Sequence, residues 1–152
     1  PIGANTNTTN LVAQYRMAAP FAFSLGASGI GYWCYNVGLS MWQPIKDEYP
    51  LVYENPDGTS ATCRRWEAVR EGMEDARILI ALHEKLSDES VSVAAKTKIR
   101  CLLDGSLRNL AKQALTDARL GVARYVLDAS YNDDTVERFR GEMMDCVALL
   151  TK

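Results

Sequence analysis

The residues best suited to binding chemistry lie close together in the first third of the chain. Trp33, Tyr35 and Asn36 end a short apolar run, and Trp42 follows them. Aromatic rings pack on the apolar faces of sugar rings, and an asparagine amide donates and accepts hydrogen bonds to hydroxyl groups. These residue types therefore suit a sugar-binding surface. The alternative, which the sequence leaves open, is that the aromatic rings fill a protein core and that Asn36 only ends a strand.

Charged side chains add weaker candidates. Arg65 stands in the first turn of a predicted helix, where a loop can approach it, and Asp47 and Glu48 form an adjacent acidic pair in a predicted loop. The only histidine, His83, has no serine or cysteine nucleophile arranged with it, so we expect it to pack in the core. Glu67, Arg70, Glu74 and Asp75 have helical spacing and predict a salt-bridge network on a helix surface.

The cysteines indicate no metal site, and we expect no cofactor. They are scattered without any C-x-x-C spacing, which argues against structural zinc and against a small disulfide scaffold. We expect free thiols that are mostly buried, because cysteine behaves as a small hydrophobic residue. The four positions are Cys34, Cys63, Cys101 and Cys146.

Length and composition indicate one globular unit with a core, because 152 residues are 47% hydrophobic and 24% charged. A net charge of -2 with mixed signs gives no basic face, so we expect no nucleic-acid partner. The apolar runs are shorter than the roughly 20 residues that span a bilayer, so we expect no membrane partner. The first residues, from Pro1, do not resemble a leader peptide, and we expect a fragment whose compartment the sequence does not predict.

The elements that must position these side chains follow from the apolar spacing. We predict a helix over 11–25, a buried strand Ile30–Tyr35, a long loop over 36–62 with a brief extended piece at 51–54, and a helix over 63–86 capped by Ser60 or Thr62. Because one strand cannot satisfy its own backbone groups, the strand needs a partner.

The second half reads as helix throughout. We predict a helix to about residue 103 capped by Ser87 or Asp88, a break at residues 104–106, a helix over 107–129, a turn at 132–134 and a last helix over 135–150. The apolar stripes of the last two helices complement each other, and an antiparallel pair within the chain satisfies both.

Three segments in this order resemble the C-terminal end of the catalytic domain of glycoside hydrolase family one hundred and twenty-three. They are the strand segment 29–36 (GIGYWCYN), the segment 51–58 (LVYENPDG) and the helix segment 65–77 (RWEAVREGMEDAR). The match runs from Leu11 to Leu86, and the founding activity of the family is β-N-acetylgalactosaminidase. The combination is more specific than any one segment.

The resemblance implies a mainly α chain that is the C-terminal fragment of a (β/α) barrel, its last helix-strand-loop-helix unit, followed by a helical appendix. Residues 1–86 would be the barrel part and 87–152 the appendix. Barrel sites lie at the C-terminal ends of strands and in the loops that follow. This position makes Trp33, Tyr35, Asn36, Trp42 and Arg65 the substrate-binding candidates, with carbohydrate as the partner of the intact protein.

The family's catalytic acids should lie before residue 1, because its Asp-Glu pair stands on an earlier strand and assists attack by the acetamido group of the substrate. The pair Asp47-Glu48 is not at that position, so we expect this chain to carry no catalytic residue and to be inactive alone. The alternative is a non-enzymatic helical interaction module that forms homo-oligomers through strand or helix pairing. A lectin-like module rests on the aromatic residues only.

Overall fold

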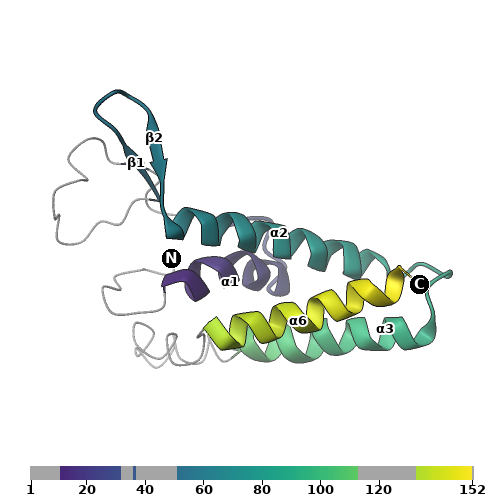
Figure 1. The fold of residues 1–152 in the computed structure, drawn as a ribbon. Coiled ribbons are helices and arrows are strands. Elements are labelled where there is room, and N and C mark those ends of the chain that lie inside the picture. Colours follow the sequence, from purple (N-terminus) through teal and green to yellow (C-terminus); the bar gives the residue numbers. More distant parts are fainter. Residues whose placement is uncertain (1–10, 32–35, 37–50, 113–132, 152) are drawn as a thin grey trace.

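The computed structural model describes residues 11–31, 36, 51–112 and 133–151, and the fold is given for these residues (Figure 1). The described part is mainly helical, as predicted. Its elements are the helices α1 (Leu11–Ser24), α2 (Arg64–Glu84) and α3 (Val93–Arg100), the π-helix η2 (Cys101–Leu107), the helix α6 (Asp133–Leu150) and the strands β1 (Val52–Glu54) and β2 (Ser60–Thr62).

Helices α1 and α2 lie side by side and run in the same direction (Figure 1). Tyr15, early in α1, packs with Ala68 and Val69 early in α2, whereas Phe23 near the end of α1 meets His83 near the end of α2 with ring centroids 6.1 Å apart. Residue numbers therefore rise in the same direction along both helices, so the two helices are parallel. The connection from α1 to α2 must return along the length of α1.

One arginine and one glycine fix the contact between these helices. Arg16 is 4% exposed, and its guanidinium Nε lies 2.9 Å from Oδ2 of Asp75, which is 5% exposed. Its Nη1 also contacts Glu71 at 2.9 Å and Glu137 of α6 at 3.3 Å. Gly72 is buried against the backbone of Arg16, where a Cβ atom would overlap the Arg16 carbonyl oxygen. The absence of a side chain at Gly72 thus permits the close approach of α1 and α2.

An antiparallel helix pair is present, and it is formed by α3 and η2 with α6. The helix that the sequence predicts as the partner, over 107–129, lies outside the described residues beyond residue 112, so that pairing stays a prediction. Lys98 of α3 contacts Asp145 of α6 at 3.1 Å, and Ser106 of η2 contacts Glu142 of α6. Residue numbers rise from α3 to η2 while those of their partners on α6 fall, so the two segments are antiparallel. The main apolar core collects buried side chains from α1, α2, α3, η2 and α6. These are Ala13, Met17, Phe21, Leu79, Leu82, Ile99, Leu102, Leu103, Leu107, Ala111, Val136, Phe139, Met143 and Cys146.

Two predicted helix caps are wrong. Ser60 and Thr62 belong to β2, and α2 begins after Cys63, whose side chain makes no capping hydrogen bond. The helix α3 begins after Ser92, whose hydroxyl accepts a hydrogen bond from the amide of Ala95 at 3.2 Å. Several polar residues could fill these positions, and local spacing alone does not choose among them.

Ser87 and Asp88 build the turn that follows α2 instead of capping α3. The Ser87 hydroxyl donates to the Glu84 carbonyl at 2.9 Å, and the Asp88 carboxylate accepts from Lys85 at 2.7 Å and from the Ser90 amide at 3.0 Å. The Lys85 and Ser90 hydrogen bonds hold the pKa of Asp88 well below its usual range. The turn after α2 is therefore held by Ser87 and Asp88, the two side chains that were predicted to cap the following helix.

Two further boundaries differ from the prediction. The expected break at residues 104–106 is part of the π-helix η2, which continues directly from α3 and passes into α-helix over 108–112. The helix α6 begins at Asp133, inside the predicted turn at 132–134. Its predicted run over 135–150 is confirmed.

The predicted strand Ile30–Tyr35 is placed only at its start. Ile30 and Gly31 are not in a strand, and residues 32–35 lie outside the described residues. A barrel origin for this segment therefore stays a prediction. The division of the chain into two parts at residue 86 also stays a prediction. The main core contains side chains from both parts.

Candidate functional site

The site predicted from the sequence is described at two positions, Asn36 and Arg65. Asn36 is partly buried, and Arg65 is the second residue of α2 and is also partly buried. The other candidates lie outside the described residues, and so does the acidic pair. They are Trp33, Tyr35 and Trp42, with Asp47 and Glu48.

Arg65 joins the start of α2 to the strand β1. Its Nη2 donates a hydrogen bond of 2.8 Å to the phenol oxygen of Tyr53. Two residues earlier, the thiol of Cys63 donates to the Leu51 carbonyl at 3.1 Å. Both contacts link the beginning of α2 and the residue before it to β1 and the residue before that strand. They fix the guanidinium of Arg65 beside a phenol at the N-terminal end of the helix.

The strand β1 is docked on the two parallel helices by a second apolar cluster. Leu51 and Val52 are buried with Tyr15 of α1 and with Ala68 and Val69 of α2. In the hairpin, Val52 pairs with Thr62, and the two strands run antiparallel. The loop predicted over 36–62 therefore contains a second strand, Ser60–Thr62, that the sequence analysis missed. Three residues are too few to show an alternating pattern.

The tip of the hairpin is closed by its own side chains. The Asp57 carboxylate accepts from the Thr59 hydroxyl at 2.6 Å and from the Thr59 amide at 2.9 Å, and Gly58 has a φ of 79°. These Thr59 hydrogen bonds lower the pKa of Asp57. The carboxylate is thus engaged in the turn, in which an Asp-Gly pair is typical, and it is not a candidate catalytic acid.

The arrangement around Arg65 suits binding more than acid-base chemistry. A guanidinium offers several hydrogen-bond donors in a fixed plane, and the Tyr53 hydroxyl holds that plane in one orientation. Arg65 was a candidate from its place in the first helical turn. Tyr53 was missed because its contact with Arg65 depends on the hairpin.

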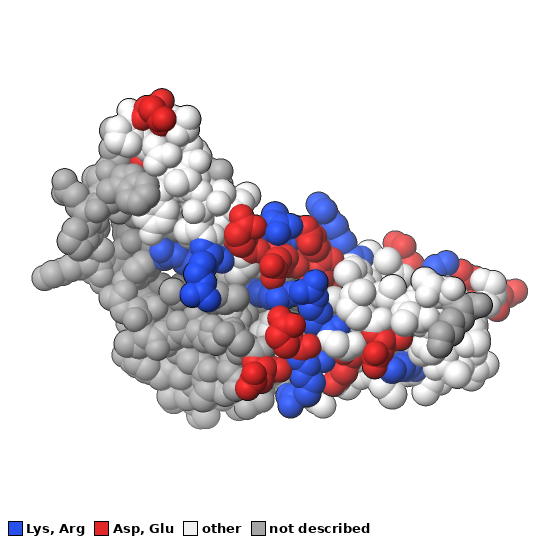
Figure 2. Space-filling view, viewed as in Figure 1, with Lys and Arg blue, Asp and Glu red and all other residues white. Residues whose placement is uncertain are grey.

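The predicted surface salt bridges are confirmed in part. Arg70 contacts Glu67 at 2.9 Å and Glu74 at 2.6 Å, all three are half-exposed, and these partners, Glu67 first, raise the pKa of Arg70. Figure 2 shows a band of mixed acidic and basic side chains across the middle of the face in view. Asp75 does not join them, because it is buried against Arg16.

The expectation that His83 packs in the core is wrong. Its side chain is exposed and touches Phe23 edge-on at the border of the helix pair. Ala76 and Leu79, with which the helical period groups it, are buried. Within the described residues no cluster of three or more histidine, cysteine or acidic side chains could hold a metal ion. None of the described helices is long and apolar enough to cross a membrane.

The described cysteines are free thiols in three different environments. Cys101 is exposed, Cys63 is partly buried, and Cys146 is buried in the main core, where burial raises the pKa of its thiol. The expectation of mostly buried thiols is therefore wrong for Cys101.

We expect alkylation to distinguish these thiols. At about pH 8, iodoacetamide should modify Cys101 well before Cys146, because the reactive species is the thiolate and Cys146 is both inaccessible and held protonated. Peptide mass spectrometry of timed samples measures the order. Equal rates for the two residues in the folded protein would contradict the burial of Cys146, and equal rates in denaturant are the control.

No family model matches the chain, and comparisons with curated proteins and with solved structures found no match either.

Proposed function

We propose that this chain is the C-terminal part of the catalytic domain of a carbohydrate-active glycoside hydrolase, similar to family one hundred and twenty-three. It contributes substrate-side residues, while the catalytic acid pair belongs to another part of the protein. The observation that carries the proposal is the parallel packing of α1 and α2, with a connection that must return between them.

Parallel neighbouring helices joined through a returning strand are the repeating unit of a (β/α) barrel. The helix α1 has 14 residues, which corresponds to a length of ~21 Å at 1.5 Å per residue. The structure does not place Ile30 and Gly31 in a strand. An extended chain over residues 30–35 would still cover ~20 Å at about 3.3 Å per residue, which is long enough to return along α1 before the hairpin leads into α2.

The position of Arg65 agrees with a place at the catalytic face of such a barrel. In a barrel, the loop after each strand and the start of the next helix lie at the face that carries the active site. Arg65 stands at the start of α2, after the predicted loop over 36–62, and it contacts Tyr53 of β1 within that loop. Trp33, Tyr35, Asn36 and Trp42 belong to that strand end and loop and would complete a sugar-binding surface.

A titration with N-acetylgalactosamine tests this proposal. We expect saturable change in tryptophan fluorescence at millimolar sugar, weakened about tenfold by Arg65→Gln, because a hydrogen bond from a charged donor contributes about 1.5–3 kcal/mol. Tyr53→Phe should weaken binding less, since it removes only the contact that orients Arg65. The matched control is Arg64→Gln at the exposed neighbouring position, which should bind as the unaltered protein does.

Two results would count against the proposal. One is fluorescence that does not change at any sugar concentration, or that changes equally in the Arg64 and Arg65 variants. The other is hydrolysis of an aryl N-acetyl-β-galactosaminide by this chain at a rate that Asp47→Asn or Glu48→Gln abolishes, because the proposal places the catalytic acids elsewhere.

A further inference from the structure

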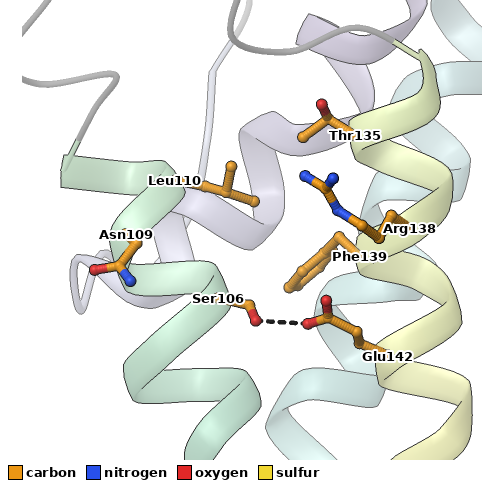
Figure 3. A pocket seen from close by; sticks show the side chains of 7 residues that line it. All are labelled: Ser106, Asn109, Leu110, Thr135, Arg138, Phe139 and Glu142. Carbon is orange, nitrogen blue, oxygen red and sulfur yellow. Dashed lines mark hydrogen bonds between the residues drawn. The ribbon is translucent and has the colours of Figure 1, made fainter.

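A half-open cavity of about 160 Å³ lies between η2 with its α-helical continuation and the first turns of α6 (Figure 3). It is separate from the residues around Arg65, because it is built entirely from the second half of the chain. Polar and apolar side chains share its lining. They include Ser106, Asn109 and Leu110 on one side and Arg138, Phe139 and Glu142 of α6 on the other.

The π-helix gives the first sign that this cavity is a built site. The wide turns of a π-helix are rare, and within α-helices they occur frequently at functional sites. Here η2 interrupts a run that is α-helical before it and after it. Ser106, in its last turn, lines the cavity and donates a 2.5 Å hydrogen bond to Oε2 of Glu142. The last turn of η2 therefore places the Ser106 hydroxyl in one wall of the cavity.

The second sign is an ion pair that does not form. Arg138 and Glu142 are four residues apart on α6, a spacing at which opposite charges commonly pair. In the described part of the chain Glu142 is engaged by Ser106 instead, and no carboxylate lies within ion-pair distance of Arg138. Figure 3 shows the Arg138 guanidinium directed into the space between the helices, above the ring of Phe139. The two charges thus remain apart at the rim of the cavity.

The lining decides the class of ligand. Arg138 and Glu142 carry opposite charges, so the cavity has no net charge, and the carboxylate would repel a phosphate or sulfate. Asn109 and Ser106 add groups that both donate and accept hydrogen bonds. The partly buried Leu110 and the small accessible part of Phe139, which is 3% exposed, offer an apolar surface. A ligand that matches this lining is neutral, carries several hydroxyl groups and has one apolar face.

We propose that this cavity binds a single neutral sugar ring. Arg138 and Glu142 hydrogen-bond neighbouring hydroxyls, Asn109 bonds a further hydroxyl, and the C–H face of the ring packs on Leu110 and Phe139. The proposal does not depend on a hydrolase origin of the chain. It assigns a carbohydrate-binding site to the helices after residue 87, separate from the site proposed around Arg65.

Amide chemical shifts of the full 152-residue chain test the proposal, because they report on the cavity residue by residue. We expect galactose, glucose or N-acetylgalactosamine, titrated separately, to shift the amides of residues 106–110 and 135–142 saturably, with a dissociation constant on the order of millimolar. Arg138→Met and Glu142→Gln should each weaken binding about tenfold. Arg108→Gln is the matched control, since Arg108 is next to the lining residue Asn109 but does not line the cavity itself and pairs with Asp104 at 3.2 Å.

The outcomes separate this site from the one around Arg65. Arg65→Gln should leave the shifts at 106–110 and 135–142 unchanged, so either proposal can fail without the other. The cavity proposal is overturned if no sugar shifts these amides, or if the Arg138 and Glu142 variants bind as the unaltered protein does while their melting temperatures are unchanged. It is also overturned if glycine or inorganic phosphate shifts them and the sugars do not.

Discussion

Replacing Gly72 with alanine is expected to lower the free energy of unfolding by about 3 kcal/mol. The added Cβ would lie 2.8 Å from the Arg16 carbonyl carbon and 3.0 Å from its Cα, and closer still to the carbonyl oxygen. These are backbone atoms of α1, so relief requires the whole helix to move. The usual gain of up to about 1 kcal/mol when alanine replaces a helical glycine does not offset this cost.

Gly141→Ala provides the matched control. Gly141 is an exposed position inside α6, and a Cβ there would meet no atom within 4 Å. It should raise stability by about 0.5–1 kcal/mol, because only the helical preference of alanine changes. Urea unfolding followed by circular dichroism measures both variants. A Gly72 variant as stable as the Gly141 variant would show that α1 and α2 are not in backbone contact.

Replacing Asp75 with alanine is expected to cost about 3–5 kcal/mol, the range seen when one partner of a buried ion pair is removed. Arg16 would remain buried without its most enclosed partner, since Glu71 and Glu137 are both more exposed than Asp75. One of its nitrogens, Nη2, already has no hydrogen-bond partner among the described residues. The loss of Asp75 therefore leaves a buried charge with contacts only at its solvent side.

Glu74→Ala, next to Asp75 on the same helix, should change stability by less than about 1 kcal/mol, because the Glu74–Arg70 pair is exposed. The double variant Arg16→Met with Asp75→Leu should recover most of the loss, since apolar side chains of similar size need no charge partner. Thermal and urea unfolding of these proteins provide the measurements. Equal losses for Glu74→Ala and Asp75→Ala would contradict the burial of Asp75.

The sequence predicted the long helices because their apolar residues recur with one period over many turns. The helix α2 was expected over 63–86 and is observed over 64–84 for this reason. Short or irregular elements were missed. Residues 104–106, Asp-Gly-Ser, have the composition of a turn, yet tertiary packing of Leu103 and Leu107 keeps them helical in a π-helix.

Contacts between distant residues account for most errors at the candidate site. Asp75 looked like a member of the surface charge cluster because its partner, Arg16, is 59 residues away. Tyr53 was not linked to Arg65 because the hairpin between them was not predicted. Arg65 itself was found, since its place in the first helical turn follows from local spacing. The sequence does not predict that Arg138 and Glu142 remain unpaired. Their separation depends on Ser106, which hydrogen-bonds Glu142 and is 36 residues away from it in the sequence.

The close approach at Gly72 also has a mechanical consequence. Where two helices touch through side chains, small rotamer changes let them slide past each other, as in shear motions. Backbone contact at Gly72, with Arg16 held on one side by Asp75, removes that freedom. The helices α1 and α2 therefore move as one rigid pair. A displacement of the hairpin β1–β2 must bend the hairpin where it joins α2, near Arg65 and Tyr53, because the two helices cannot slide past each other.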